Sequence, residues 1–455
     1  MNKFFRIAKD VVSFSTKRKW LDMIDNQQTV VDYIHLCFLL DSCQLQQRAH
    51  GGDKQKEIPR KRKNFREDIV IPLGDVYFRR SYRMKIQSFY ILYSILKSEL
   101  ENEFLPQVQN NRRKQSKYHI DLKIRLSAAL RFFAGGDPYD IMISHGISHS
   151  SVYRSIWGVV DCVNRCETLS FHFPTHEEQR TIAQGFKSMS GALFDCVIGC
   201  IDGMLVWTTK PSKSECKKEK CGEKNFKCSR KDKFGLNLQA ICDNKLKFIW
   251  IDIKWPGATS DYMAWVTTAL CHELESTDKL ANGMCLVGDN AYIKKRYMSV
   301  PLKGIVNTYD DAYNFYCSQL RITIERAFGV LVHRWSILRR PINCPLHKVS
   351  PMIMALCRLH NFCIDMKERD APMTTKEDAS HTIASLDAMN RSPVYAGGST
   401  DIVRIEHGRP TSLLNGGCHF LDAPRNRLQA TDHCPMDTML EQVKSMNLTR
   451  PKNTK

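Results

Sequence analysis

Three acidic residues lie in surroundings where a carboxylate needs a partner. Asp202 interrupts a very apolar run, Asp289 closely follows a second one, and Glu325 lies at the margin of the apolar face of a helical pattern. A carboxylate that is buried without a cation or a hydrogen-bond donor is costly to the folded state. A site that gathers the three side chains around a cation would satisfy them together.

The chemistry that these acids could perform is phosphodiester cleavage. Carboxylate oxygens from separate parts of the chain, with no matching Cys or His set, suit Mg²⁺ or Mn²⁺. Two such ions can activate a water or a 3′-hydroxyl and stabilise the leaving oxygen of a phosphodiester. In that site Asp202 bridges the two ions, Asp289 binds one and Glu325 the other, and Asp261 is a candidate fourth ligand.

Each acid also has a plainer interpretation. An Asp after a strand is often a turn former or a helix cap, and a helical Glu beside an Arg, such as Glu325 beside Arg326, is usually a solvated ion pair. Taken singly, each acid favours the plainer interpretation. Their joint order of strand, strand and helix makes a metal site an equal alternative.

Four predicted strands and three predicted helices must position these acids. Residues 196–201 are a continuous apolar run, typical of a central strand, and 204–208 can continue it past Asp202. Residues 235–242 and 248–253 flank a turn and predict a hairpin. Residues 284–287 predict another strand, followed by Asp289.

The predicted helices carry the remaining acids and close the domain. Thr259 or Ser260 can cap a helix that has Asp261 in its first turn. Residues 318–338 predict a helix that carries Glu325, and Ser350 with Pro351 predicts the start of a helix through residue 363.

A helix-turn-helix pattern precedes this part of the chain. Residues 122–133 are apolar at helical spacing, Asp137 and Pro138 predict the start of a second helix, and Ser148 can cap a third at 150–163. The start of the third helix carries small polar and basic side chains that could contact DNA. Helical bundles share this pattern, so both interpretations stay open at this point.

The composition predicts an intracellular protein that binds a polyanion. The chain has 455 residues and a formal net charge of +19, which favours binding to nucleic acid. The 18 cysteines are scattered, mostly inside apolar runs, as expected of free thiols. No uncharged apolar run approaches the roughly 18 residues of a membrane span. We expect no secretory signal either, with a weak transit peptide at the N-terminus as the less favoured alternative.

Two basic segments stand out. Residues 53–66 hold seven basic and two acidic residues, which predicts a flexible linker, a nuclear-import signal or a DNA-contacting patch. Residues 210–233 hold ten basic and four acidic residues and predict a basic loop over a DNA groove. Cys216, Cys221 and Cys228 lie in this loop, but their spacing lacks a CxxC pair, so zinc is the less favoured alternative. Neither a P-loop nor a dinucleotide glycine pattern is present.

Residues 119–364 resemble the Harbinger-type (PIF/Harbinger) DDE transposases and their domesticated nuclease relatives. The resemblance rests on five motifs in order and on the 35 residues that separate Asp289 from Glu325. The motifs are CIDG at 200–203, PGATSD at 256–261, GDNAY at 288–292, NFYCSQLRITIERAFG at 314–329 and LHNFC at 359–363.

This resemblance implies an α/β fold, with an RNase H-like mixed sheet flanked by helices and preceded by a helix-turn-helix-like helical domain. It implies that Asp202, Asp289 and Glu325 are the catalytic triad, that they and Asp261 bind Mg²⁺ or Mn²⁺, and that double-stranded DNA is the substrate. It also implies a nuclear protein, with a Myb-like partner protein and homo-oligomerisation as further expectations. The alternative is a catalytically silent, domesticated DNA-binding protein that keeps the fold.

We therefore expect four regions. They are a helical and basic region at 1–118 with a linker at 51–67, the helix-turn-helix-like domain at 119–190, the DDE catalytic domain at 191–365 and a loosely ordered tail at 366–455.

Overall fold

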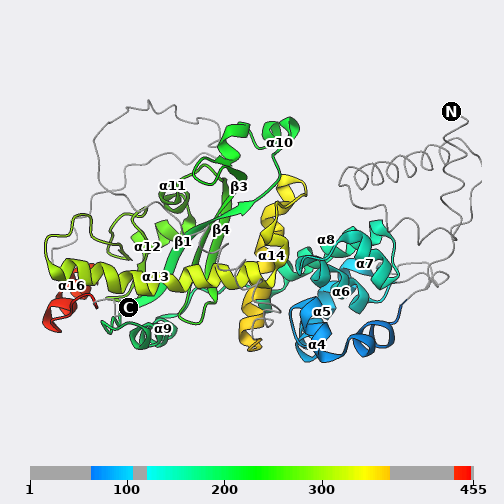
Figure 1. Cartoon of the computed structure of the whole chain (residues 1–455), viewed down its shortest axis with the longest axis horizontal. Coiled ribbons are helices and arrows are strands. Elements are labelled where there is room, and N and C mark those ends of the chain that lie inside the picture. Colours follow the sequence, from blue (N-terminus) through cyan, green and yellow to red (C-terminus); the bar gives the residue numbers. More distant parts are fainter. Residues whose placement is uncertain (1–62, 106–119, 369–434, 452–455) are drawn as a thin grey trace, which may run out of the picture. The chain divides into compact units, whose positions relative to one another are not determined.

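The computed structural model describes residues 63–105, 120–368 and 435–451 (Figure 1). The chain divides into two units, Met1–Arg60 and Lys61–Lys455, and the described residues all belong to the second. The basic segment at 53–66 and the predicted linker at 51–67 lie mostly outside the described residues, as does most of the predicted tail.

The first described part, residues 63–105 and 120–190, contains helices and no strand. A short π-helix precedes α4, and α5 follows it; α9 leads into the sheet. Their bounds are Arg66–Val70 for the π-helix, Ile71–Tyr82 for α4, Ile86–Phe104 for α5, Leu122–Phe133 for α6, Pro138–His145 for α7, His149–Arg165 for α8, Glu167–Leu169 for a 3₁₀ turn and His176–Met189 for α9.

Helices α6, α7 and α8 lie where the sequence predicts three successive helices. The Asp137 side chain accepts a hydrogen bond from the N–H of Tyr139 at the start of α7, and the Ser148 side chain accepts one from Ser151 at the start of α8. Gly146 ends α7 with φ 63°, in the left-handed region that suits glycine. Asp137, Gly146 and Ser148 therefore mark the start of α7, its end and the start of α8.

A six-stranded mixed sheet forms the second part. Strand β3 pairs antiparallel with both β1 and β4, while β1, β5 and β6 run parallel to one another. The short β2 pairs with the start of β3. The strands are β1 Val197–Trp207, β2 Lys227–Cys228, β3 Lys233–Cys242, β4 Phe248–Pro256, β5 Cys285–Val287 and β6 Met298–Ser299.

Strand β1 runs without a break through Asp202 and Gly203. It pairs with β3 from Cys200 to Trp207, but its pairing with β5 ends at Cys200. From Asp202 onward, β1 therefore has no partner strand on the β5 side. This opening beside the carboxyl end of β5 is where Asp289 follows.

Helices cover both faces of the sheet (Figure 1). Cys200 and Met204 belong to the core that includes residues of α13 and α14, whereas Ile201 and Ile241 belong to the core that includes Trp265. The covering elements are α11 Asp261–Val266, α12 Ala269–Ser276, α13 Thr308–Arg334 and α14 Leu346–Asp365; α10 Lys213–Lys218 and two 3₁₀ turns, Glu223–Phe226 and Ser336–Arg339, lie in the connections.

Two predicted boundaries differ from the structure. Helix α13 begins at Thr308, capped by the Asn307 side chain, rather than near residue 318. Helix α14 begins at Leu346 rather than at Pro351, and the Ser350 hydroxyl donates to the carbonyl of Ile253 instead of capping a helix.

The segment at 366–455, which we expected to be loosely ordered, contains a helix. Helix α16, Pro435–Ser445, packs against α13 and β6. Lys294 forms an ion pair with Asp437, and the Tyr309 hydroxyl donates to the Asn447 side chain. The buried Met436, Met439 and Val443 supply the apolar face that low overall periodicity concealed in the sequence.

Within the described residues, no helix is both long enough and apolar enough to cross a membrane.

Candidate acidic active site

Asp202 lies in the middle of β1, on the face of the sheet that α13 covers. Its side chain is 17% exposed. One carboxylate oxygen accepts from the N–H of Gly203 at 2.8 Å, and the other accepts from Nη1 of Arg321 at 3.2 Å. Burial raises the pKa of Asp202 to about 7, against the opposing effect of Arg321 and with a further increase from the charge of Asp289.

Arg321 joins Asp202 to Glu325. Arg321 and Glu325 are one turn apart on α13, and Nη2 of Arg321 donates to the Glu325 carboxylate, whose side chain is 21% exposed. One guanidinium group therefore binds a carboxylate from the first strand and a carboxylate from the late helix. The four-residue spacing on a helix makes the pairing with Glu325 geometrically natural.

Asp289 lies at the carboxyl end of β5. Its Oδ1 accepts from the N–H of Ala291 at 2.8 Å. Burial raises the pKa of this carboxyl group, and the charge of Asp261 adds to the increase, whereas the Ala291 hydrogen bond and Arg321 act in the opposite direction. Asp289 and Arg321 both line a cavity of about 260 Å³ beside the start of the loop after β5.

Asp261 approaches from the opposite face of β1. It is the first residue of α11, which Ser260 caps, as predicted. Its Oδ1 accepts from Nδ2 of Asn237 at 3.0 Å and from Nε2 of Gln239 at 2.8 Å. The Tyr292 hydroxyl donates to Oε1 of Gln239 at 2.6 Å. This amide and hydroxyl network orients Asp261 and satisfies one of its oxygens.

Gly203 is the point of close approach between β1 and Asp261. A Cβ atom at this position would lie 2.0 Å from Oδ1 of Asp261 and 2.6 Å from Nε2 of Gln239. Glycine is therefore required for packing, because any side chain would displace the network that orients Asp261.

The predicted acids gather in one region, but they do not form a ready metal site. The charges of Asp202, Asp261 and Asp289 all raise the pKa of Tyr292, after the larger effect of its burial, so the three acids lie within electrostatic range of one buried hydroxyl. Arg321 links Glu325 to these acids, because it donates to both Glu325 and Asp202. In the parts of the chain that the structure describes, however, no three His, Cys, Asp or Glu side chains lie close enough to hold a metal ion as they stand.

Several residues of this region carry roles that sequence reasoning did not assign. Arg321 and Tyr292 belong to the motifs quoted for the resemblance, and Asn237 and Gln239 belong to the predicted strand at 235–242, but their side-chain partners were not predicted. The four-residue spacing from Arg321 to Glu325 was a usable signal. So was the alternation of Asn237 and Gln239, which places both on one face of β3.

The basic loop at 210–233 lies next to the acids at its C-terminal end. Burial and the charge of Arg230 lower the pKa of Lys231, while the charges of Asp202 and Asp261 act to raise it. Arg230 in turn lowers the pKa of Asp289. Two cationic side chains therefore lie within electrostatic range of the acidic site. Elsewhere in the loop, Lys210 pairs with Glu223 at 2.8 Å.

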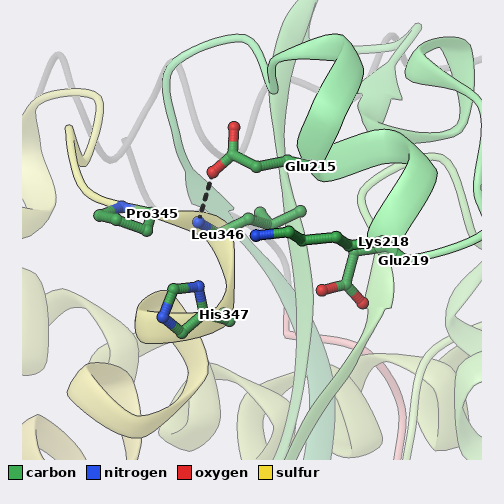
Figure 2. Close-up of a pocket in the computed structure, with 6 residues that line it drawn as sticks. All are labelled: Glu215, Lys218, Glu219, Pro345, Leu346 and His347. Atoms are coloured by element: carbon green, nitrogen blue, oxygen red, sulfur yellow. Dashed lines mark hydrogen bonds between the residues drawn. The ribbon is translucent and has the colours of Figure 1, made fainter.

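The same loop is anchored to the start of α14. Glu215 accepts from the N–H of Leu346 at 2.8 Å, the bond drawn in Figure 2, and from the N–H and hydroxyl of Ser212. Pro345, His347, Lys218 and Glu219 complete a cavity of about 490 Å³. No metal group forms here among the described residues, so the zinc alternative for Cys216, Cys221 and Cys228 is not supported.

Comparisons with known proteins agree with this geometry. Residues 201–361 match the family described as DDE superfamily endonuclease. A relative in Arabidopsis thaliana, "Protein ALP1-like", is 23% identical over 281 residues, which are 58% of this chain and 66% of that protein. The chain thus spans slightly less than two thirds of the curated relative that it matches.

No solved structure matches the chain. The matched range nevertheless runs from the middle of β1 to α14, and it contains all four acids and the residues that orient them. The mixed sheet with helices on both faces, together with its acidic edge, is similar to the DDE superfamily endonuclease domain.

Proposed function

We propose that the protein is a metal-dependent DNA endonuclease and strand transferase of the Harbinger type, with an RNase H-like catalytic domain. One observation carries the proposal: the carboxylates of Asp202 and Glu325 share a single cationic group, with Asp289 beside it. Side chains from strand β1, from the end of β5 and from helix α13 were predicted to converge, and this arrangement supports that prediction.

The residues present fit a divalent cation. The donor set consists of carboxylate oxygens, which Mg²⁺ and Mn²⁺ prefer. The shared guanidinium shows that Asp202 and Glu325 can be neutralised by one positive charge placed between them. Asp202, Asp289 and Glu325 would hold the ion, with Asp261 as a further ligand or as an orienting neighbour. When bound, the ion activates the attacking hydroxyl and neutralises the leaving oxygen.

The chain's own residues set the reacting geometry. The amides of Asn237 and Gln239 orient Asp261, and Tyr292 orients Gln239 in turn. Arg230 and Lys231 offer positive charge near the acids, where they can hold the phosphate that is cleaved. Burial of Asp202 and Asp289 strengthens their electrostatic interaction with any bound cation.

DNA binding follows from charge and from the helical region. The net charge of +19 and the basic loop at 210–233 suit contacts with the phosphate backbone, which position DNA without reading its sequence. The helix pair α7 and α8 is the part we assign to recognition of double-stranded DNA. A nuclear location, a Myb-like partner protein and homo-oligomerisation belong to the same proposal.

A catalytically silent, DNA-binding descendant is the second candidate. It is favoured by the pairing of Asp202 and Glu325 with Arg321, because this pairing satisfies both acids without a metal. The two candidates make opposite predictions for cleavage.

The test is nicking of supercoiled plasmid DNA by the purified full chain with Mg²⁺, Mn²⁺ or EDTA. We expect nicking only with the divalent ions, and a loss of about a hundredfold or more in Asp202→Asn, Asp289→Asn and Glu325→Gln. Asp278→Asn, at an exposed position before β5, is the matched control and should cleave normally. Cleavage that persists in Asp202→Asn contradicts the assignment. Salt-dependent DNA binding without cleavage in any metal supports the silent alternative.

A further inference from the structure

We propose that Arg321 is an internal counter-cation that closes the acidic site until a divalent ion displaces it. The inference rests on the proposed function and adds a residue that controls metal entry. Arg321 binds two of the three predicted metal ligands through two different nitrogens of one guanidinium group. It therefore occupies the space between these acids that a shared metal ion would need.

Because Arg321 is part of α13, its guanidinium always lies near the acids and competes with a metal ion for them. It lies one turn before Glu325 on α13, so it stays near the site whatever its rotamer. Its side chain is 25% exposed, which leaves it accessible to solvent on one side. Because one nitrogen donates to each carboxylate, two ion pairs are lost whenever a metal ion replaces the guanidinium.

A displaced Arg321 side chain has a neighbouring space to enter. Arg321 itself lines the cavity of about 260 Å³ next to Asp289, and the cavity walls include Ser318, from the preceding turn of α13, and Pro301. In this inference, rotation about the bonds of the arginine side chain carries the guanidinium into that cavity.

The consequence is an opposite effect of Arg321 on the metal-free and the metal-bound protein. Without metal, Arg321 offsets the repulsion among Asp202, Asp289 and Glu325 and stabilises the fold. With metal, the same side chain competes for the ligands and weakens binding. A residue that served only to support the site would instead strengthen both the fold and metal binding.

The experiment is a titration of the full chain with Mn²⁺, with free Mn²⁺ measured by electron paramagnetic resonance, alongside thermal unfolding in EDTA. We expect Arg321→Gln to bind Mn²⁺ about five- to tenfold more tightly than the wild type and to unfold at a lower temperature in EDTA. Arg326→Gln, an exposed neighbour on the same helix, is the control and should match the wild type in both measurements. In Arg321→Gln combined with Asp289→Asn, the gain in affinity should be lost.

A second measurement uses the wild-type protein and does not depend on a variant that folds. The side-chain NMR signal of the Arg321 guanidinium should show slow exchange with water in EDTA and fast exchange once Mg²⁺ is added. A signal that Mg²⁺ leaves unchanged, while the ion binds, overturns the inference.

The outcomes separate this inference from the proposed function. If the wild type binds Mn²⁺ and Arg321→Gln binds it no more tightly, Arg321 is not a competitor, although the nuclease assignment stands. If neither protein binds Mn²⁺, the metal-dependent function itself is wrong and the inference falls with it. If Arg321→Gln binds Mn²⁺ and the wild type does not, Arg321 excludes the ion completely, which supports its role as a competitor.

Discussion

The ionised carboxylate of Asp202 lowers the stability of the folded protein. Its carboxyl group is buried beside Asp289, and one arginine and one backbone N–H are its hydrogen-bond partners. A group in this position prefers the protonated form, so the folded protein binds a proton there more readily than the unfolded chain does. The conflict persists although the Arg321 guanidinium donates to Asp202, and a bound divalent ion would remove it.

The first prediction concerns pH. The pKa of Asp202 is about 7 in the folded protein against 3.8 for an ordinary Asp, so this group lowers the stability of the metal-free protein as pH rises through that window. Asp202→Asn removes the effect. In EDTA, its free energy of unfolding relative to the wild type should increase between about pH 5 and about pH 8. Urea unfolding at both pH values measures this, and a difference that does not vary with pH contradicts it.

The second prediction concerns Gly203. Gly203→Ala places a methyl group against Oδ1 of Asp261, so we expect a loss of about 1–3 kcal/mol in stability and reduced cleavage. Gly222→Ala in the basic loop is the matched control, because nothing lies within 4 Å of its Cβ position. Urea unfolding and plasmid nicking measure both effects; if Gly203→Ala behaves like Gly222→Ala, the close approach described for β1 is incorrect.

At the scale of elements, local signals in the sequence were sufficient where they were strong. The strands β1, β3, β4 and β5 follow apolar runs, and the caps Asp137, Ser148 and Ser260 start helices as predicted. The first ten residues of α13 were missed because they are rich in aromatic residues, which are weak helix formers. Tertiary packing of Tyr313 and Cys317 makes this stretch helical.

The third prediction concerns the anchoring of the basic loop. Glu215→Ala removes the bond to the Leu346 N–H and the capping box of α10, which should cost about 1 kcal/mol and weaken DNA binding by freeing the loop. Glu219 lines the same cavity, and Glu219→Ala is the control for the lost negative charge. Fluorescence anisotropy with a DNA duplex measures the affinities. If the Glu215 variant binds DNA as tightly as the Glu219 variant, the loop does not need this anchor.

The whole molecule joins its helical part and its sheet through one continuous core. Trp335, after α13, packs edge to face on Phe133 of α6 with ring centroids 6.3 Å apart. Glu368, after α14, is buried and accepts from the N–H of Lys85 at 3.0 Å and from the Ser88 hydroxyl. Arg334 donates to the carbonyl groups of Arg83 and Glu368. Buried polar bonds therefore attach the start of α5 to the ends of α13 and α14, the helices that cover the sheet.

The fourth prediction tests this attachment. Glu368→Ala leaves the N–H of Lys85 and the Ser88 hydroxyl without their acceptor, so we expect a loss of about 2–4 kcal/mol and faster hydrogen exchange in α5. Glu368→Gln keeps an acceptor oxygen and should lose less. Hydrogen exchange read by mass spectrometry follows α5 directly, and unchanged protection in Glu368→Ala would argue against the attachment.

For the candidate site, the sequence indicated which acids to consider but not which side chains contact them in the folded chain. The acids were recognisable because each is out of place in its local pattern. Arg321 was not, since an arginine on an amphipathic helix is ordinary, and its role depends on Asp202 lying across a space that only the folded chain defines. The helix α16 was also missed, because its local periodicity is weak and its apolar face is buried only against other elements of the folded chain.

The most direct test of this account is the location of Mn²⁺ in crystals of the full chain, read from anomalous diffraction. We predict a peak bounded by the carboxylates of Asp202, Asp289 and Glu325, with the Arg321 guanidinium moved out of the space between Asp202 and Glu325 where it now donates to both. A peak at any other set of residues, or an Arg321 that keeps both ion pairs in crystals saturated with Mn²⁺, would contradict it.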